Sequence, residues 1–299
     1  MATLYTQAES NIRKTWLYLT FFLLLIIGIG WFLSYYYQNQ LILYIATAFG
    51  ILTGFSTYWY SDKIVLAMTK AKPIEKKDNA ELYRFVENLC IAAGLPLPKI
   101  YIIDETQPNA FATGRDVNHA VIAVTRGLLE KLEKPELEGV IAHELSHIGN
   151  KDILLQTIVV ILVGIIANLS NLFLRFSLLG RGRRNSNSKG GNILLILGIV
   201  AIILAPIAAT LIRLAISRKR EFLADASGAL LTRYPEGLAR ALEKISADPH
   251  SLKVASNSTA HLFIASPFKG RESTSWFVKL FLTHPPVEER IKVLREMSI

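Results

Sequence analysis

The stretch "VIAHELSHIGNKD" at residues 140–152 carries two histidines and a glutamate, and a long uncharged apolar run follows it directly. His143, Glu144 and His147 form the pattern HExxH. Positions i and i+4 of a helix lie on one face, so a helix here would present both imidazoles to one metal ion. Exposed surface histidines are the alternative. The apolar residues around the motif predict instead a buried helix, in which His and Glu side chains need partners.

The chemistry that this pattern indicates is hydrolysis with a bound zinc ion. Catalytic zinc usually takes three protein ligands and leaves one position for water, whose pKa falls to about 7. Glu144 would take the proton of that water as the water attacks a peptide carbonyl. The segment "REFLADASGA" (220–229) offers a third ligand, because Glu221 and Asp225 are four residues apart on one helical face. One carboxylate would bind the metal, and the other would hydrogen-bond the far nitrogen of a ligand histidine.

Spacing alone leaves other interpretations of the third ligand open. Glu221 follows the basic run "RKR", so an ordinary ion pair is a competing explanation for this glutamate. The remaining histidines could also supply a ligand; they are at positions 119, 250, 261 and 284.

Residues 15–61 contain no Asp, Glu, Lys or Arg. One helix of this length would measure about 70 Å, more than twice the roughly 30 Å of a hydrocarbon core. Two spans are therefore predicted, at about 16–34 and 41–60, with the tyrosine-rich "SYYYQNQ" (34–40) as the turn at headgroup depth. A cleaved signal peptide is disfavoured, because no small-x-small cleavage site follows the first span and a second span comes almost at once.

Two further uncharged runs, residues 153–174 and 190–212, also have the length of a spanning helix, although buried core helices are the alternative. Lysines and arginines flank the first hairpin at both ends and are absent from its turn, which predicts that both ends face the cytoplasm. The basic loop 175–190 would then lie outside if both later runs span, against the same rule. The sequence leaves the depth of this second hairpin open.

Composition limits the partners of the chain. Of its 299 residues 51% are hydrophobic, and the formal net charge is +9. The basic residues gather beside the apolar runs, which favours a lipid bilayer over nucleic acid as the partner of this charge. Cys90 is the only cysteine, so an intrachain disulfide and a cysteine-based metal cluster are both excluded.

Residue periodicity predicts a mixed α/β domain around the motifs. The expected elements are a helix over 78–93, strands over 98–104 and on both sides of a "GRDVN" turn within 109–125, and helices over 126–133, 135–150, 217–232, 236–247 and 286–298. We expect four segments: an N-terminal transmembrane hairpin (1–61), a first catalytic part with the HExxH helix (62–152), a second apolar hairpin (153–216), and a second catalytic part with the third zinc ligand (217–299).

Four segments, "HELSHIGNKD", "EFLAD", "NAFATG" and "THPPVEERI", resemble the HtpX family of bacterial and archaeal membrane zinc metallopeptidases, which is related to the type I CAAX prenyl endopeptidases. The resemblance covers nearly the whole chain. It implies a mainly α membrane protein with a zincin-type α+β catalytic domain, in which an apolar hairpin is inserted between HExxH and the third ligand. It further implies a multi-pass protein of the cell (inner) membrane that binds one Zn²⁺ per chain. Its polypeptide substrates would be misfolded or damaged membrane proteins, cleaved on the cytoplasmic side in stress-related quality control.

The resemblance also assigns roles residue by residue. His143, His147 and Glu221 would be the zinc ligands. Glu144 would act first as general base and then as proton donor to the leaving amine. Asp225 would hydrogen-bond a ligand histidine without binding the metal itself.

Two further assignments follow from the same resemblance. His284 would lie near the metal and stabilise the oxyanion or gate the open position, accompanied by Arg290; a loop histidine before a Pro-Pro turn is the alternative. Asn109, Ala110 and Phe111 would lie on an edge strand that hydrogen-bonds an extended substrate backbone. An ordinary strand start is the alternative there.

Two other functions are alternatives to this one. A protease that cuts inside the bilayer would need its motif within an apolar span, and "LEKPELEG" (132–139) directly before the motif is too polar for that. A non-enzymatic, zinc-stabilised membrane scaffold or holdase would not need a water-activating carboxylate. The presence of Glu144 favours the enzyme.

Overall fold

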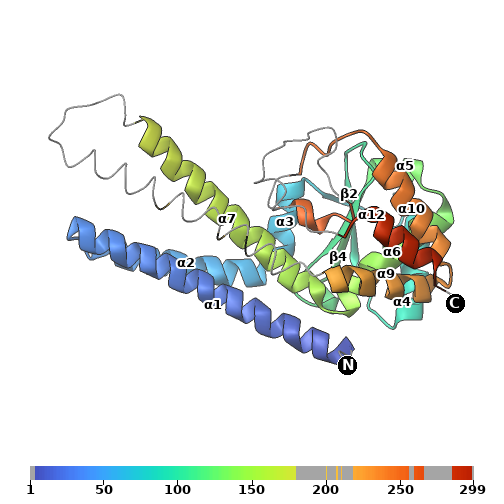
Figure 1. Ribbon diagram of the computed structural model, residues 1–299, viewed down its shortest axis with the longest axis horizontal. Coiled ribbons are helices and arrows are strands. Elements are labelled where there is room, and N and C mark those ends of the chain that lie inside the picture. Colours follow the sequence, from blue (N-terminus) through green and yellow to red (C-terminus); the bar gives the residue numbers. More distant parts are fainter. Residues whose placement is uncertain are drawn as a thin grey trace.

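The computed structural model describes residues 4–179, 200, 207, 210, 218–255, 259–265 and 285–297. Long helices form an arm on one side of the molecule, and a mixed α/β part lies at its end (Figure 1). The arm consists of α1 (Leu4–Tyr37), α2 (Leu41–Trp59) and α7 (Asp152–Leu179). The α/β part contains strands β1 (Lys72–Pro73), β2 (Lys99–Ile103), β3 (Ala110–Thr113) and β4 (Val121–Thr125), and helices α3 (Ser61–Thr69), α4 (Ala80–Ala93), α5 (Arg126–Lys131), α6 (Lys134–Gly149), α9 (Arg218–Thr232), α10 (Pro235–Ala247) and α12 (Val287–Arg295).

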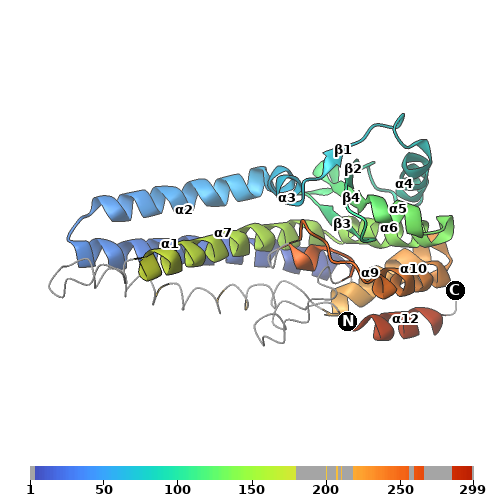
Figure 2. The same ribbon diagram turned by 90° about the horizontal axis from the view of Figure 1, so that it is seen from above.

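The helices of the arm have the length and composition of membrane spans. The candidate spans among the described residues are Glu9–Tyr37, Leu41–Trp59 and Asp152–Leu172, and Figure 2 shows their helices running alongside one another. They contain or overlap the predicted runs at 16–34, 41–60 and 153–174. The predicted run 190–212 lies outside the described residues except for positions 200, 207 and 210. Of the predicted loop 175–190, residues 175–179 form the end of α7 instead, and the rest lies outside the described residues.

Helix α1 packs against the first half of α7. The contact is a cluster of buried apolar side chains, among them Tyr18 and Phe22 from α1 and Ile158 and Leu162 from α7. Because α7 begins three residues after α6 ends, this contact holds the N-terminal part of α1 beside the α/β part. The membrane arm and the HExxH helix are therefore connected through the first turns of α7.

The sheet has the strand order β1-β2-β4-β3, so β3 is an edge strand. β2 and β4 are parallel, whereas β1 pairs antiparallel with β2 and β3 antiparallel with β4. Alternate side chains of β3 point to opposite faces, and both faces are covered. Ala110 and Ala112 face a core shared with α4, α6 and α10, while Phe111 faces a second core shared with α3 and α7.

The predicted helices and strands of the α/β part match the observed ones to within a few residues, but α3 and β1 were not predicted. Helix α3 follows α2 directly, but its charged Asp62 and Lys63 interrupt the apolar pattern of the span. Strand β1 is only two residues long and fully exposed, so it carries no alternation of apolar residues. The described part is thus mostly helical, with a small sheet next to the motif helix.

Candidate active site and metal centre

The HExxH motif lies on α6, which begins at a capping box. The side chain of Glu133 accepts a backbone N–H from the first turn, and Glu136 accepts the N–H of Glu133 at 2.8 Å. Val140, Ile141 and Leu145 are at most 1% exposed and pack in the core beneath the helix. The other side of α6, with the two histidines, therefore faces α9 and the start of α7.

Helix α9 crosses α6 closely enough to bring an acid to the histidines. A Cβ atom at Gly228 would lie 2.9 Å from the backbone nitrogen of His143, so a larger residue would force the two helices apart. Gly228 is seven residues, about two turns, after Glu221 and lies on the same face of α9. The small residues of "ADASGA" are therefore the feature of the sequence that indicates close packing of α9 on another helix. The i,i+4 spacing of Glu221 and Asp225 does not indicate this packing.

Three buried side chains from α6 and α9 converge on one point. The candidate ligand atoms of His143, His147 and Glu221 all lie within 4.8 Å of one another. Nε2 of His147 is 3.2 Å from Nε2 of His143 and 3.7 Å from Oε1 of Glu221. Ligand atoms around a tetrahedral metal ion at about 2.0–2.1 Å lie about 3.3 Å apart, so the two histidine nitrogens already have the separation that a shared ion needs, and the glutamate oxygen lies a few tenths of an ångström further away. Among the described residues this is the one group of its kind.

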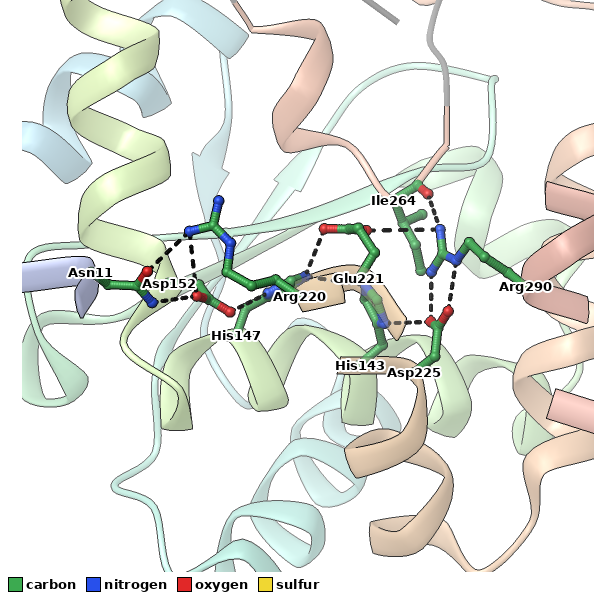
Figure 3. A network of polar contacts seen from close by, with 9 residues as sticks. All are labelled: Asn11, His143, His147, Asp152, Arg220, Glu221, Asp225, Ile264 and Arg290. Carbon is green, nitrogen blue, oxygen red and sulfur yellow. Dashed lines mark hydrogen bonds and ion pairs between the residues drawn. The ribbon is translucent and has the colours of Figure 1, made fainter. Parts of the chain in front are cut away.

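The far nitrogens of both histidines face carboxylates (Figure 3). Nδ1 of His143 is 2.9 Å from Oδ1 of Asp225. Nδ1 of His147 donates a hydrogen bond of 3.1 Å to Oδ2 of Asp152. A carboxylate behind each ring fixes its orientation and leaves Nε2 for the metal. Sequence reasoning missed Asp152, although it is the last residue of the stretch "VIAHELSHIGNKD".

Arg290 from α12 holds Asp225 in place. Its guanidinium donates two hydrogen bonds to the carboxylate, at 2.8 and 2.7 Å, and a third of 2.9 Å to the carbonyl of Ile264. Burial alone would raise the pKa of Asp225, but the charge of Arg290 outweighs it and lowers this pKa to about 2. Asp225 is therefore a carboxylate even though it is fully buried.

Glu144 is buried between the candidate metal ligands and the sheet. The backbone N–H of Ala112 on the edge strand β3 lies close to the carboxylate of Glu144 and favours its charged form. Burial, and to a smaller degree the charge of Glu221, raises the pKa of Glu144 to about 7, against the opposing effect of His147. Burial lowers the pKa of His147, but Asp152 and Glu221 outweigh it and raise the net value to about 9.

The three residues predicted to bind substrate lie at the start of β3 and are fully buried. The amide of Asn109 donates to the carbonyl of Ala265 at 3.1 Å, and the carbonyl of Ala110 accepts the N–H of Ile264 at 3.1 Å. The ring of Phe111 packs edge-on against Phe263. In this structure the residues Phe263–Ala265 therefore lie along the first part of the edge strand.

The other histidines are not part of this cluster as far as the structure describes them. His119 and His250 pair with the nearby Asp116 and Asp248. His284, predicted to lie near the metal, falls outside the described residues, so its role stays a prediction. The side chain of His261 is also outside them.

Comparison with known proteins identifies the family. Residues 76–298 match the model of peptidase family M48. The chain is 46% identical over 301 residues to the "Protease HtpX homolog" of Thermoanaerobacter pseudethanolicus, covering 99% of both chains. It is 47% identical over 288 residues to the protein of the same name from Pyrococcus furiosus, covering 96% of both. The crystal structure of S. mikatae Ste24p aligns with a TM-score of 0.49 and 21% identity, covering 90% of this chain and 62% of that one.

These matches agree with the observed geometry. M48 peptidases use a metal, typically zinc, and the buried His-His-Glu group offers a site for one. The apolar helices of the arm agree with the membrane character of the HtpX relatives. The chain belongs to peptidase family M48 and is a membrane metalloprotease of the HtpX type.

Proposed function

We propose that this chain is a zinc-dependent endopeptidase, anchored in the cell membrane with its active site toward the cytoplasm, that cleaves misfolded or damaged membrane proteins. The observation that carries the proposal is the convergence of His143, His147 and Glu221 on one buried point, with Glu144 directly beside it. A scaffold stabilised by zinc would need the three ligands but not the carboxylate of Glu144.

Zinc is proposed as the metal because two imidazole nitrogens and one carboxylate oxygen form a typical catalytic ligand set that leaves one position open. Bound there, zinc would supply a Lewis acid that polarises the peptide carbonyl and lowers the pKa of water to about 7. The fold around these ligands would then be of the zincin type, with the HExxH helix packed under the sheet.

The residues of the chain would perform the proton transfers and the positioning. Glu144 would accept a proton from the attacking water and pass it to the leaving amine nitrogen, and the N–H of Ala112 orients its carboxylate for this. Asp225, held by Arg290, and Asp152 orient the two ligand histidines. His284 would stabilise the developing oxyanion, as the family resemblance implies.

The substrate is proposed to bind as an extended strand along β3. This strand lies at the edge of the sheet, and Ala112 on it contacts Glu144, so a peptide added here would run past the catalytic carboxylate. Ile264 already bonds the carbonyl of Ala110. Pairing of substrate at Ala110 therefore requires that Ile264 move away.

Removal of the metal is expected to stop hydrolysis reversibly. The full chain, purified in detergent and stripped with a chelator, should not cleave casein, and one equivalent of zinc should restore cleavage because the three protein ligands fit it. Peptide release is measured before and after zinc is added. Equal cleavage with and without metal would overturn the zinc mechanism, and no cleavage in any zinc-loaded sample would favour the scaffold.

The proposed orientation predicts opposite labelling of two engineered thiols in a Cys90→Ala background. Position 130 lies on the exposed surface of the α/β part, and position 40 lies in the turn between α1 and α2. An impermeant maleimide should label Glu130→Cys only in inside-out vesicles and Gln40→Cys only in right-side-out vesicles. The reverse pattern would place the active site outside the cytoplasm.

A further inference from the structure

We propose that Asn11, near the start of the membrane helix α1, is a positioning residue for the metal ligand His147 and acts through Asp152. The inference rests on the proposed zinc site. It adds to that site a residue of the membrane arm that helps to orient a metal ligand. Asn11 lies outside the segment 76–298 that matches the family model.

The contacts form a continuous chain from the arm to the metal ligand (Figure 3). Nδ2 of Asn11 donates to Oδ1 of Asp152 at 2.6 Å, and Oδ2 of the same carboxylate accepts from Nδ1 of His147 at 3.1 Å. Arg220 closes the group, because its Nη1 donates to Oδ1 of Asn11 at 3.1 Å and lies 3.7 Å from Asp152. All four residues are buried, with at most 5% of the surface of each residue exposed.

The chemistry of the amide explains why asparagine fits this position. An amide offers donors on one side and an acceptor on the other, so Asn11 can give a hydrogen bond to an anion and take one from a cation at once. Asp152 can only accept while it is charged, and it accepts from both Asn11 and His147. The carboxylate is therefore held at both oxygens, which fixes the imidazole ring and directs Nε2 to the metal.

The two ligand histidines differ in where their support comes from. Asp225 and Arg290, which support His143, both lie in the α/β part. Asp152 is the first residue of α7, and its second oxygen is held by a residue 141 positions earlier in the chain. Helix α1 also packs along α7 through Tyr18 and Phe22. We therefore expect the packing of α1 against α7 to determine where Asn11 holds the carboxylate of Asp152. Arg220 directly precedes Glu221, so the same group also touches the turn that carries the third ligand.

Asn11→Leu keeps the approximate volume of the side chain and removes both of its hydrogen bonds. We expect the affinity for zinc to fall about 10-fold, the lower end of the effect of losing an outer partner of a ligand. The ligand-field spectrum of the cobalt-substituted protein should also change, because the geometry of His147 is altered. Thr15→Val is the matched control: Thr15 is buried one turn further along α1, and its hydroxyl bonds the Asn11 carbonyl of its own helix. It should change zinc affinity less than about twofold.

A double-mutant cycle separates positioning from general stability. Zinc dissociation constants are measured by chelator competition on the full chain in detergent for wild type, Asn11→Leu, Asp152→Ala and the double variant, with the thermal midpoint of each metal-free protein alongside. If Asn11 acts through Asp152, the 10-fold loss disappears in the Asp152→Ala background, where the acceptor of the Asn11 amide is gone. Unchanged zinc affinity in Asn11→Leu, or the same loss with and without Asp152, would overturn the proposal.

The zinc content of the wild-type protein distinguishes failure of the proposed function from failure of this inference. Wild-type protein that binds no zinc would refute the proposed function itself, whereas wild type with one zinc and an unaffected Asn11→Leu variant would refute only this inference. If Asn11→Leu does not fold, Asn11→Ser carries the same cycle, because serine is too short to reach both Asp152 and Arg220.

Discussion

Glu144→Gln is expected to abolish peptide hydrolysis while the protein keeps its zinc. The substitution preserves the shape of the side chain and its acceptor for the Ala112 N–H, but an amide cannot take a proton from water or return it to the leaving nitrogen. We expect kcat/KM to fall about 1,000-fold or more, within the range for loss of general acid–base catalysis. The measurement is cleavage of casein or a quenched peptide, with zinc per chain determined on the same sample.

Glu138→Gln on the same helix is the control for this change. Glu138 is half-buried and lies outside the cluster of candidate ligands, so its substitution should leave both rate and zinc content close to wild type. Cleavage by Glu144→Gln at more than a tenth of the wild-type rate would show that another group moves the proton.

Glu221→Ala is expected to lose both the metal and the activity. Two imidazoles would remain at the site, and catalytic zinc usually needs a third protein ligand. The loss should exceed the 10- to 100-fold weakening, about 1.4–2.7 kcal/mol, that removal of an outer partner produces, which is the effect we expect for Asp225→Asn. Zinc content after dialysis and casein cleavage are measured for both variants.

Lys219→Ala, two residues earlier on the exposed side of α9, is the matched control and should bind a full equivalent of zinc. A full equivalent in Glu221→Ala would move the third ligand elsewhere. An Asp225→Asn variant that loses as much metal as Glu221→Ala would exchange the roles assigned to these two carboxylates.

Local sequence patterns predicted the elements that carry the site. The i,i+4 spacing placed His143 and His147 on one helix, and the same spacing put Glu221 and Asp225 on another. These are short-range properties of one helix, and they need no knowledge of the fold. Spacing alone left the identity of the third metal ligand open. The resemblance to HtpX proteins predicted that Glu221 on the second helix binds the same ion as the two histidines.

What the sequence did not reveal depends on turns and on contacts between distant segments. Asp152 is five residues after His147, but the helix ends at Gly149, and Lys151 adopts a positive φ of 56° before α7 begins. Helical spacing therefore does not apply between them, and only the turn returns the carboxylate to the ring. The pairing of Asn11 with Asp152 spans 141 residues and has no local signal at all.

Arg290 shows the same limit from the other end of the chain. Sequence reasoning placed it beside His284, six residues earlier, because the two share one motif. The structure puts its guanidinium on Asp225, with both of the closest contacts at that carboxylate. Which acid a buried arginine pairs with is decided by the packing of α12 against α9, and no spacing within "THPPVEERI" contains that information.

The most direct test of this account is the position of zinc in crystals of the wild-type chain, located by anomalous diffraction at the zinc edge. We predict a single peak about 2.0–2.2 Å from Nε2 of His143, Nε2 of His147 and a carboxylate oxygen of Glu221. A peak bound to the two histidines without Glu221, or a zinc-loaded active enzyme with no peak at this point, would contradict the account.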